Sequence, residues 1–212
     1  MISGYLIQKI KEKNESKGLY IPKFINASSI HKCPREVYYL MKGVEPQKRE
    51  TQWFTLEIGN SLHTMFQKFN TGSNLSEDRF VNKEYNLACR PDDVVWWPDK
   101  EMVALIEYKV TNPRSFYRLD KPKEEHIWQW NCTSFIIGIP TGEISYFCPD
   151  TSLRDVAKFK DFPMERDEEI VKRIKEKAEY LNKCLETDTL PCMEKDKCKW
   201  CLYKKRCKED AK

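Results

Sequence analysis

The sequence lacks an apolar run of bilayer-spanning length and a signal-peptide pattern, so we expect a soluble, cytoplasmic protein with no membrane partner. It also lacks a repeat of fixed period and a low-complexity segment, which argues against a repeat array. Neither sign of charge is in large excess: the net charge of +4 does not by itself indicate nucleic-acid binding, although the charged third of the chain could form a basic face. The 212 residues, 40% apolar and 12% aromatic, suffice for one packed domain over residues 1–212.

Cysteine is plentiful, with nine residues, an odd number at uneven spacing. A disulfide framework suits small secreted domains, so in an intracellular chain these thiols favour a metal or iron–sulfur site. The candidate ligands lie near the two chain ends: Cys33, Cys192, Cys198, Cys201 and Cys207. The remaining cysteines fall in predicted strands or helices, where we expect buried thiols: Cys89, Cys132, Cys148 and Cys184.

Hydrophobic periodicity predicts an α/β protein. Helical spacing covers residues 2–13, a segment that starts at Ser28 or Ser29 and carries Cys33, and residues 53–69, 122–137 and 165–185. Strand-like patterns cover residues 80–87, 92–97, 102–110, 144–148 and 156–162. Pro98-Asp99-Lys100 is a good turn, so the second and third strands are expected to form an antiparallel hairpin. The Cys- and Lys-rich C-terminal end has little core-forming pattern.

Charged residues stand at informative positions in this predicted hairpin. Glu107 and Lys109 lie two residues apart on one strand, so their side chains point to the same face. The neighbouring strand offers Asp92 or Asp93, and alternation allows only one of them to reach that face. Two carboxylates hold a hard cation, Mg²⁺ or Mn²⁺, and an ammonium stabilises charge or orients the attacking water. The pattern predicts metal-assisted phosphodiester hydrolysis; the simpler alternatives are a turn at the Asp pair and an exposed Glu–Lys ion pair.

Arg90-Pro91-Asp92 followed by Glu107-Tyr108-Lys109 resembles the PD-(D/E)XK nuclease superfamily, and Gly59-x-x-x-His63 resembles its RecB-like branch. The resemblance implies a restriction-endonuclease-like core over about residues 53–162, with element order αβββαβ and a mixed central sheet flanked by helices. It implies that the metal ligands are His63, Asp92, Glu107 and the main-chain carbonyl of Tyr108. Lys109 would assist the water nucleophile, and Gln129 would contact the DNA backbone or position the lysine. The chain departs from the family pattern twice, since glycine is absent before the Asp motif and Thr133 replaces a tyrosine.

The segment Ser29 to Arg35, together with Cys198-x2-Cys201-x5-Cys207, resembles the iron–sulfur nucleases of that branch. These include AddB-like helicase–nuclease subunits and the CRISPR-associated exonuclease family, the fourth Cas family. The resemblance implies a [4Fe–4S] cluster held by Cys33, Cys198, Cys201 and Cys207. Such a cluster would join elements at about residues 28–42 and 186–208. Zinc is the alternative metal, and Cys192 is the alternative to Cys33.

The chain length suits the CRISPR-associated family better than the larger AddB-like proteins. The resemblance therefore implies an exonuclease that acts on single-stranded DNA from the 5′ end, with the CRISPR integrase complex as a partner and a homo-oligomer as one expected state. A stand-alone or virus-encoded repair or recombination nuclease, including a junction-cleaving one, is the first alternative. A non-catalytic DNA-binding module with a structural metal is the second. Candidate phosphate contacts, which could equally be solvated surface, are Arg114, Arg118, Lys204 and Lys205.

Overall fold

The computed structural model describes residues 9, 12, 20–47, 57, 59, 61, 62, 64, 65, 78–97, 100–149, 158–199 and 201–210. The described positions between 57 and 65 are helical, in agreement with the helix predicted over residues 53–69. Lys9 and Glu12 are helical too, and the rest of the helix predicted at residues 2–13 lies outside the described residues, as does His63. None of the described helices is long and apolar enough to cross a membrane.

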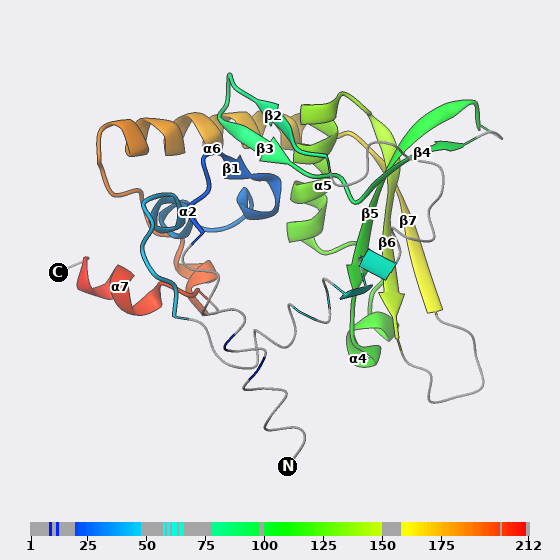
Figure 1. Cartoon of the computed structure of the whole chain (residues 1–212), viewed down its shortest axis with the longest axis horizontal. Helices are drawn as coiled ribbons and strands as arrows, with labels where there is room; N and C mark the ends of the chain where they lie inside the picture. The colour runs from blue at the N-terminus through cyan, green and yellow to red at the C-terminus, as the bar shows by residue number, and fades with distance from the viewer. Residues whose placement is uncertain are drawn as a thin grey trace, which may run out of the picture.

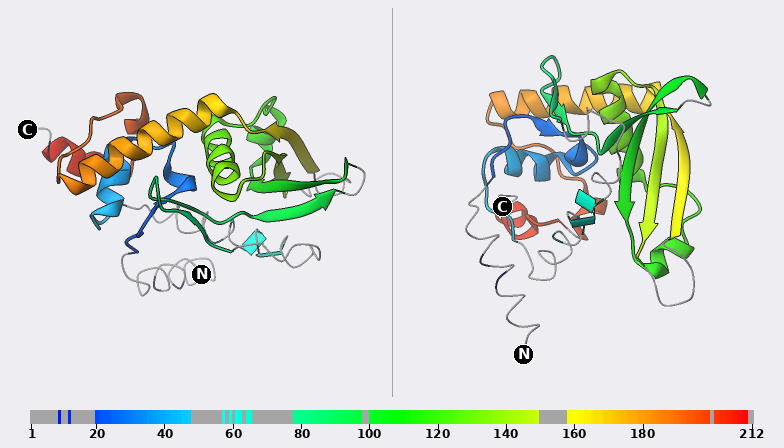
Figure 2. Two further views of the ribbon diagram at one scale, coloured as in Figure 1. Left: turned by 90° about the horizontal axis from the view of Figure 1, so that it is seen from above. Right: turned by 45° about the vertical axis from the view of Figure 1, so that its right-hand side comes forward.

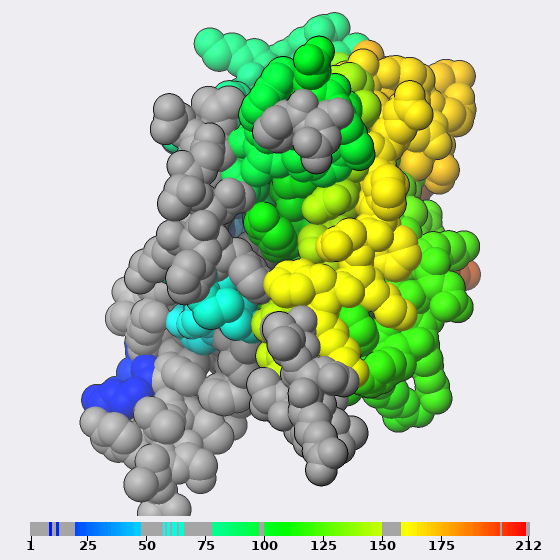
Figure 3. Space-filling view, turned by 90° about the vertical axis from the view of Figure 1, so that its right-hand side faces the viewer, coloured from blue at the N-terminus to red at the C-terminus, as the bar shows by residue number. Residues whose placement is uncertain are grey.

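The main sheet is mixed and has the strand order β4-β5-β6-β7 (Figure 1). Its strands are β4 (Asp93–Trp97), β5 (Met102–Val110), β6 (Thr141–Cys148) and β7 (Lys158–Glu165). The β4–β5 pair is antiparallel, with Asp93 opposite Ile106, which confirms the predicted hairpin. β5 and β6 are parallel, β6 and β7 are antiparallel, and β7 lies at the surface as an edge strand (Figure 3).

The crossover between the parallel strands consists of α4 (Pro113–Tyr117) and α5 (Glu124–Ile137). A parallel pair needs such a crossover, and α5 covers the sheet face from which Leu105, Ile144 and Tyr146 project. Trp130 of α5 is fully buried there and donates its indole N–H to Leu105 O at 3.2 Å. α5 ends at Gly138, which adopts a left-handed φ of 79°, as predicted for a helix stop. This packing fixes α5 above the strand that carries Glu107 and Lys109.

A second, smaller sheet has the order β1-β3-β2 and adjoins the other side of α5. Its strands are β1 (Ile25–Asn26), β2 (Phe80–Asn82) and β3 (Leu87–Cys89), and the short helix η1 (Ala27–Ser29) follows β1. The single strand expected over residues 80–87 is wrong. Asn86 adopts a φ of 56°, and Asn82 Oδ1 accepts from Tyr85 N at 3.1 Å, so the chain reverses and forms a hairpin.

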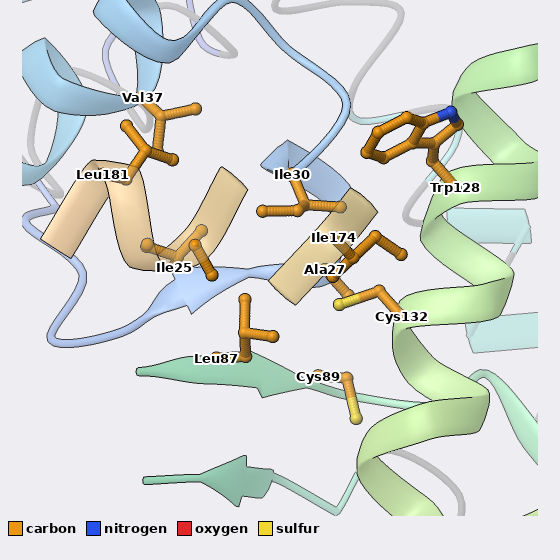
Figure 4. Close-up of a cluster of buried hydrophobic side chains, with 11 residues drawn as sticks. Ile25, Ala27, Ile30, Val37, Leu87, Cys89, Trp128, Cys132, Ile174 and Leu181 are labelled. Carbon is orange, nitrogen blue, oxygen red and sulfur yellow. The ribbon is translucent and has the colours of Figure 1, made fainter. Parts of the chain in front are cut away.

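The long helix α6 (Glu168–Glu186) covers this smaller sheet. The N-cap residue of this helix is Asp167, whose side chain accepts hydrogen bonds from two backbone N–H groups of the first turn. Buried residues at helical spacing include Ile174 and Leu181, which pack with Ile25, Leu87 and Cys132 in a core cluster (Figure 4). The four cysteines outside the candidate ligand set are buried, as expected: Cys89, Cys132, Cys148 and Cys184.

The segment around α2 and the C-terminal segment pack together beside α6 (Figure 2). The elements are α2 (Pro34–Met41), η3 (Lys195–Lys199) and α7 (Lys204–Glu209). α2 begins at Pro34, with Cys33 preceding it, rather than at Ser28 or Ser29, because residues 27–29 form a separate 3-10 turn. The C-terminal end also contributes more core than its pattern predicts: Tyr203 and Cys207 are buried against Tyr39.

Gly142 of β6 is packed too tightly for any side chain. It lies opposite Leu105, and a Cβ there would collide with the Leu105 backbone carbonyl. We expect Gly142→Ala to lower the free energy of unfolding by about 2 kcal/mol or more, measured by urea denaturation. Gly59→Ala is the control, because a Cβ at this helical position meets nothing within 4 Å. Equal stability of the two variants would contradict the tight β5–β6 packing.

Candidate functional site

Glu107, Lys109 and Gln129 form a closed hydrogen-bonded network between β5 and α5. Lys109 Nζ lies 2.5 Å from Glu107 Oε1 and 3.1 Å from Gln129 Oε1. Gln129 Nε2 donates to the same Glu107 oxygen at 2.6 Å. Strand alternation places Glu107 and Lys109 on the face covered by α5, and the helix brings Gln129 down onto them. The structure therefore brings together three side chains that the sequence singled out.

Asp92, rather than Asp93, shares the face of Glu107. Asp93 pairs with Ile106 across the hairpin, so the preceding residue falls opposite Glu107. Asp92 Oδ2 accepts from Tyr108 N at 2.8 Å, and its charge acts on both Glu107 and Lys109. Asp93 accepts from Val94 N at 2.8 Å and from the Tyr108 hydroxyl at 3.4 Å, on the opposite face. Of the two registers, the geometry favours Asp92 as the second carboxylate.

Burial perturbs the charges of this site. The pKa of Glu107 is raised to about 7, chiefly because the carboxyl group is buried and then because Asp92 is negative, while Lys109 opposes the shift. Burial alone would lower the pKa of Lys109, yet the neighbouring carboxylates raise it above its ordinary value. Glu107 Oε2 is enclosed and has no hydrogen-bond partner. Two crowded carboxylates with an unsatisfied oxygen fit a divalent cation, which would relieve their repulsion.

A preformed ligand set is not evident around this pair. Among the described residues, no three His, Cys, Asp or Glu side chains are arranged to hold one metal ion. Thr133, where the family pattern has tyrosine, is buried on α5. The candidate phosphate contacts are exposed, two at α4 and two on α7: Arg114, Arg118, Lys204 and Lys205.

A polar cavity of about 330 Å³ opens beside Gln129. It lies between the β1–η1 connection, β3 and α5, and Arg79 and Arg90 contribute two guanidinium groups to its wall. Ser28 and Asn26 add further polar groups. This cavity is suited to a negatively charged ligand next to the carboxylate–lysine network.

Sequence reasoning missed two residues that adjoin the network, Tyr146 and His126. Tyr146 on β6 is fully buried and lies in register with Lys109. Its hydroxyl lies 2.6 Å from His126 Nδ1, and burial, Lys109 and Lys123 lower the pKa of His126 to about 3. Alternation along β6 could have placed Tyr146 on the α5 face, but the parallel register that sets it beside Lys109 depends on the fold.

The four cysteines of the predicted cluster line one cavity of about 230 Å³ between α2 and the C-terminal segment; they are Cys33, Cys198, Cys201 and Cys207. Three of the sulfurs accept hydrogen bonds: Cys33 from Glu194 N at 3.3 Å, Cys201 from Tyr203 N at 3.4 Å and Cys207 from Arg35 Nη1 at 3.5 Å. Basic side chains complete the wall, namely Arg35, Lys195, Lys197, Lys204 and Lys208. Cys192 is exposed and is not among the residues that line this cavity. Glu36 also lines the cavity, and burial raises the pKa of Cys198 and raises that of Cys201 to about 11. Cys198 Sγ donates to Glu194 O at 3.5 Å, so these thiols would have to lose their protons to bind a metal.

Comparison with known proteins places the fold. No protein-family model matches the chain, and no curated protein sequence matches it. Solved structures do match: the protein SSO0001 has 19% identity and a TM-score of 0.61, over 96% of this chain and 94% of that one. An alkaline exonuclease, LHK-Exo from Laribacter hongkongensis, has 17% identity and a TM-score of 0.54, over 90% and 95% of the two chains. A phage related exonuclease from Haemophilus somnus 129PT has 14% identity and a TM-score of 0.51, over 80% and 96%. The chain therefore has the α/β nuclease fold of these exonucleases, which is the fold that the resemblance to PD-(D/E)XK nucleases predicts.

Proposed function

We propose that the chain is a divalent-metal-dependent DNA nuclease, acting as an exonuclease on single strands from the 5′ end. The observation that carries the proposal is the buried network of Glu107, Lys109 and Gln129 beside Asp92, on a fold shared with two exonucleases. The polar cavity with Arg79 and Arg90 supports a phosphodiester substrate next to that network. The fully buried Glu107 argues against the exposed ion pair of the simpler alternative.

The residues divide the chemistry between them. Asp92, Glu107, the Tyr108 carbonyl and His63 would hold Mg²⁺ or Mn²⁺, which supplies Lewis-acid activation of water and phosphate when bound. Lys109 stays protonated because the carboxylates raise its pKa, so it serves as a cation that stabilises developing negative charge, not as a base. Gln129 bridges Lys109 and Glu107 and fixes both side chains at 2.6–3.1 Å.

The test is cleavage of 5′- and 3′-labelled single-stranded DNA with Mg²⁺ or Mn²⁺, with EDTA as the metal-free control. Wild type and Lys109→Ala run side by side, with Lys175→Ala on α6 as a matched lysine variant remote from the network. We expect metal-dependent degradation that is lost in Lys109→Ala and retained in Lys175→Ala, with the label pattern giving the polarity. Equal products from wild type and Lys109→Ala would refute the assignment. No cleavage of single strands, forks or junctions would favour the DNA-binding module.

We further infer that the four-cysteine cavity holds a [4Fe–4S] cluster. Its four cysteines have the spacing of the iron–sulfur nucleases that the sequence resembles, and its volume of about 230 Å³ leaves room for a cluster of several atoms. Anaerobically purified protein should contain iron and acid-labile sulfide in near-equal amounts. Stoichiometric zinc without sulfide would support the alternative metal.

We propose a role in CRISPR adaptation on the cysteine pattern, Cys33 with Cys198, Cys201 and Cys207. A partner complex of the CRISPR integrase should then co-purify with the chain or stimulate trimming of its DNA. A stand-alone or virus-encoded repair nuclease would show neither effect while keeping metal-dependent cleavage.

A further inference from the structure

The phenol of Tyr146 determines the protonation of a neighbouring histidine. Tyr146 is 0% exposed, and its hydroxyl accepts from Lys123 N at 3.0 Å. A buried hydroxyl also carries one proton that needs an acceptor. Of the two hydrogen-bond partners that this hydroxyl has among the described residues, His126 Nδ1, at 2.6 Å, is the one that can accept the proton, because the Lys123 N–H is itself a donor. The Tyr146 hydroxyl therefore donates to His126 Nδ1.

This hydrogen bond determines the tautomer of the neutral His126 imidazole. Burial and the positive charges of Lys109 and Lys123 lower the pKa of His126, so the ring is neutral at physiological pH. With Nδ1 accepting, the single ring proton sits on Nε2. Within the part of the chain that the structure describes, Nε2 makes no hydrogen bond, and it is not among the enclosed polar atoms without partners. His126 therefore has an uncharged N–H donor that the described residues leave without a partner.

His126 lies one helical turn before Gln129 on α5, on the side that faces β5 and β6. We propose, on the basis of the proposed nuclease function, that His126 Nε2–H donates to an oxygen of the phosphate next to the scissile phosphate of the bound DNA strand. Tyr146 would hold the ring in that tautomer. A neutral donor suits this position, because an imidazolium would repel Lys109. His126 is unsuited to act as a general base, since its Nδ1 lone pair is already used by Tyr146.

Kinetics test the contact. We expect His126→Ala to lower kcat/KM for single-stranded DNA by roughly 10-fold or more, mainly through KM, as for a lost hydrogen bond to a charged group. His126→Gln keeps an N–H donor and should restore most of this loss. Tyr146→Phe should lie between wild type and His126→Ala. Tyr85→Phe is its control, because Tyr85 packs against Phe135 of the same helix, with ring centroids 5.9 Å apart.

A spectroscopic readout separates the contact from a packing role. The chain has three histidines, so a ¹⁵N-histidine spectrum is simple, and His126→Gln identifies the His126 signals. We expect the Nε2–H tautomer in wild type, a tautomer mixture in Tyr146→Phe, and a shift of the Nε2 signal with a phosphorothioate oligonucleotide and Ca²⁺. An Nδ1–H tautomer, or unchanged kcat/KM in His126→Ala with active wild type, would overturn this inference alone. Inactive wild-type protein would overturn the proposed function and this inference together.

Discussion

Glu107→Gln is expected to reduce metal-dependent cleavage by roughly 10²- to 10³-fold, mainly in kcat. The amide has nearly the shape of the carboxyl group, so the packing against α5 is kept. It cannot serve as an anionic metal ligand, and it removes the charge that holds Lys109 Nζ at 2.5 Å. Glu143→Gln on β6 is the matched control, because burial and Asp161 also raise the pKa of Glu143, which lies away from the network. Cleavage by Glu107→Gln at the wild-type rate would remove Glu107 from the site.

The same variant should be more stable than wild type in EDTA at pH 8. The folded-state pKa of Glu107, about 7, lies above the ordinary 4.5, so the folded protein holds this proton more tightly than the unfolded chain does. The contribution of Glu107 to stability is therefore fully present below pH 4.5 and is lost as the pH rises through 7. Replacing the acid removes this decline, a gain of about 1–3 kcal/mol in urea denaturation at pH 8 that vanishes at pH 4. Mg²⁺ should raise the melting temperature of wild type but not of Glu107→Gln.

Because burying charged side chains lowers stability, Glu107 and Lys109 could be predicted as site residues from the sequence. Glu107 and Lys109 stand out because charges inside a strand of Leu105, Ile106 and Val110 need a reason, and alternation puts them on one face. The choice between Asp92 and Asp93 needed the hairpin register, which a turn sequence leaves open by one residue. Tyr146 reaches Lys109 only through the parallel β5–β6 pairing, which depends on the crossover helix.

Two predictions about the fold were wrong, one because of a local backbone conformation and one because of a contact between residues far apart in the sequence. The strand expected over residues 80–87 breaks because Asn86 tolerates left-handed backbone, a choice that hydrophobic periodicity does not reveal. The C-terminal end is buried because Tyr203 packs on Tyr39, with ring centroids 5.5 Å apart. Partners so far apart in the sequence leave no periodic signal, although the cysteine spacing indicated that these two segments meet.

Because these two segments are joined at Cys207, Cys207→Ser is expected to have a second large effect, on metal content and on stability. Cys207 is buried, accepts from Arg35 and joins the cavity that carries the proposed cluster. Loss of one of the four thiolates should release the iron and remove the cross-link between α2 and α7. A cross-link across more than about 100 residues contributes about 5 kcal/mol by the chain-entropy estimate, so the melting temperature should fall by roughly 10–20 °C. Iron and sulfide analysis and thermal unfolding, each with and without a chelator, measure both effects.

Two further cysteine variants decide which four thiols act. Cys33→Ser should behave like Cys207→Ser, because Cys33 precedes α2 and lines the same cavity. Cys192→Ser should keep its iron, because Cys192 is exposed and its backbone N–H bonds to the Tyr180 hydroxyl at 2.8 Å. The reverse result, with iron lost from Cys192→Ser and kept by Cys33→Ser, would place all four ligands in the C-terminal segment. The segment around α2 and the C-terminal segment would then be held by packing, as of Tyr39 on Tyr203, and by hydrogen bonds such as Arg35 Nε to Pro191 O, and the large loss of stability in Cys207→Ser would not be seen.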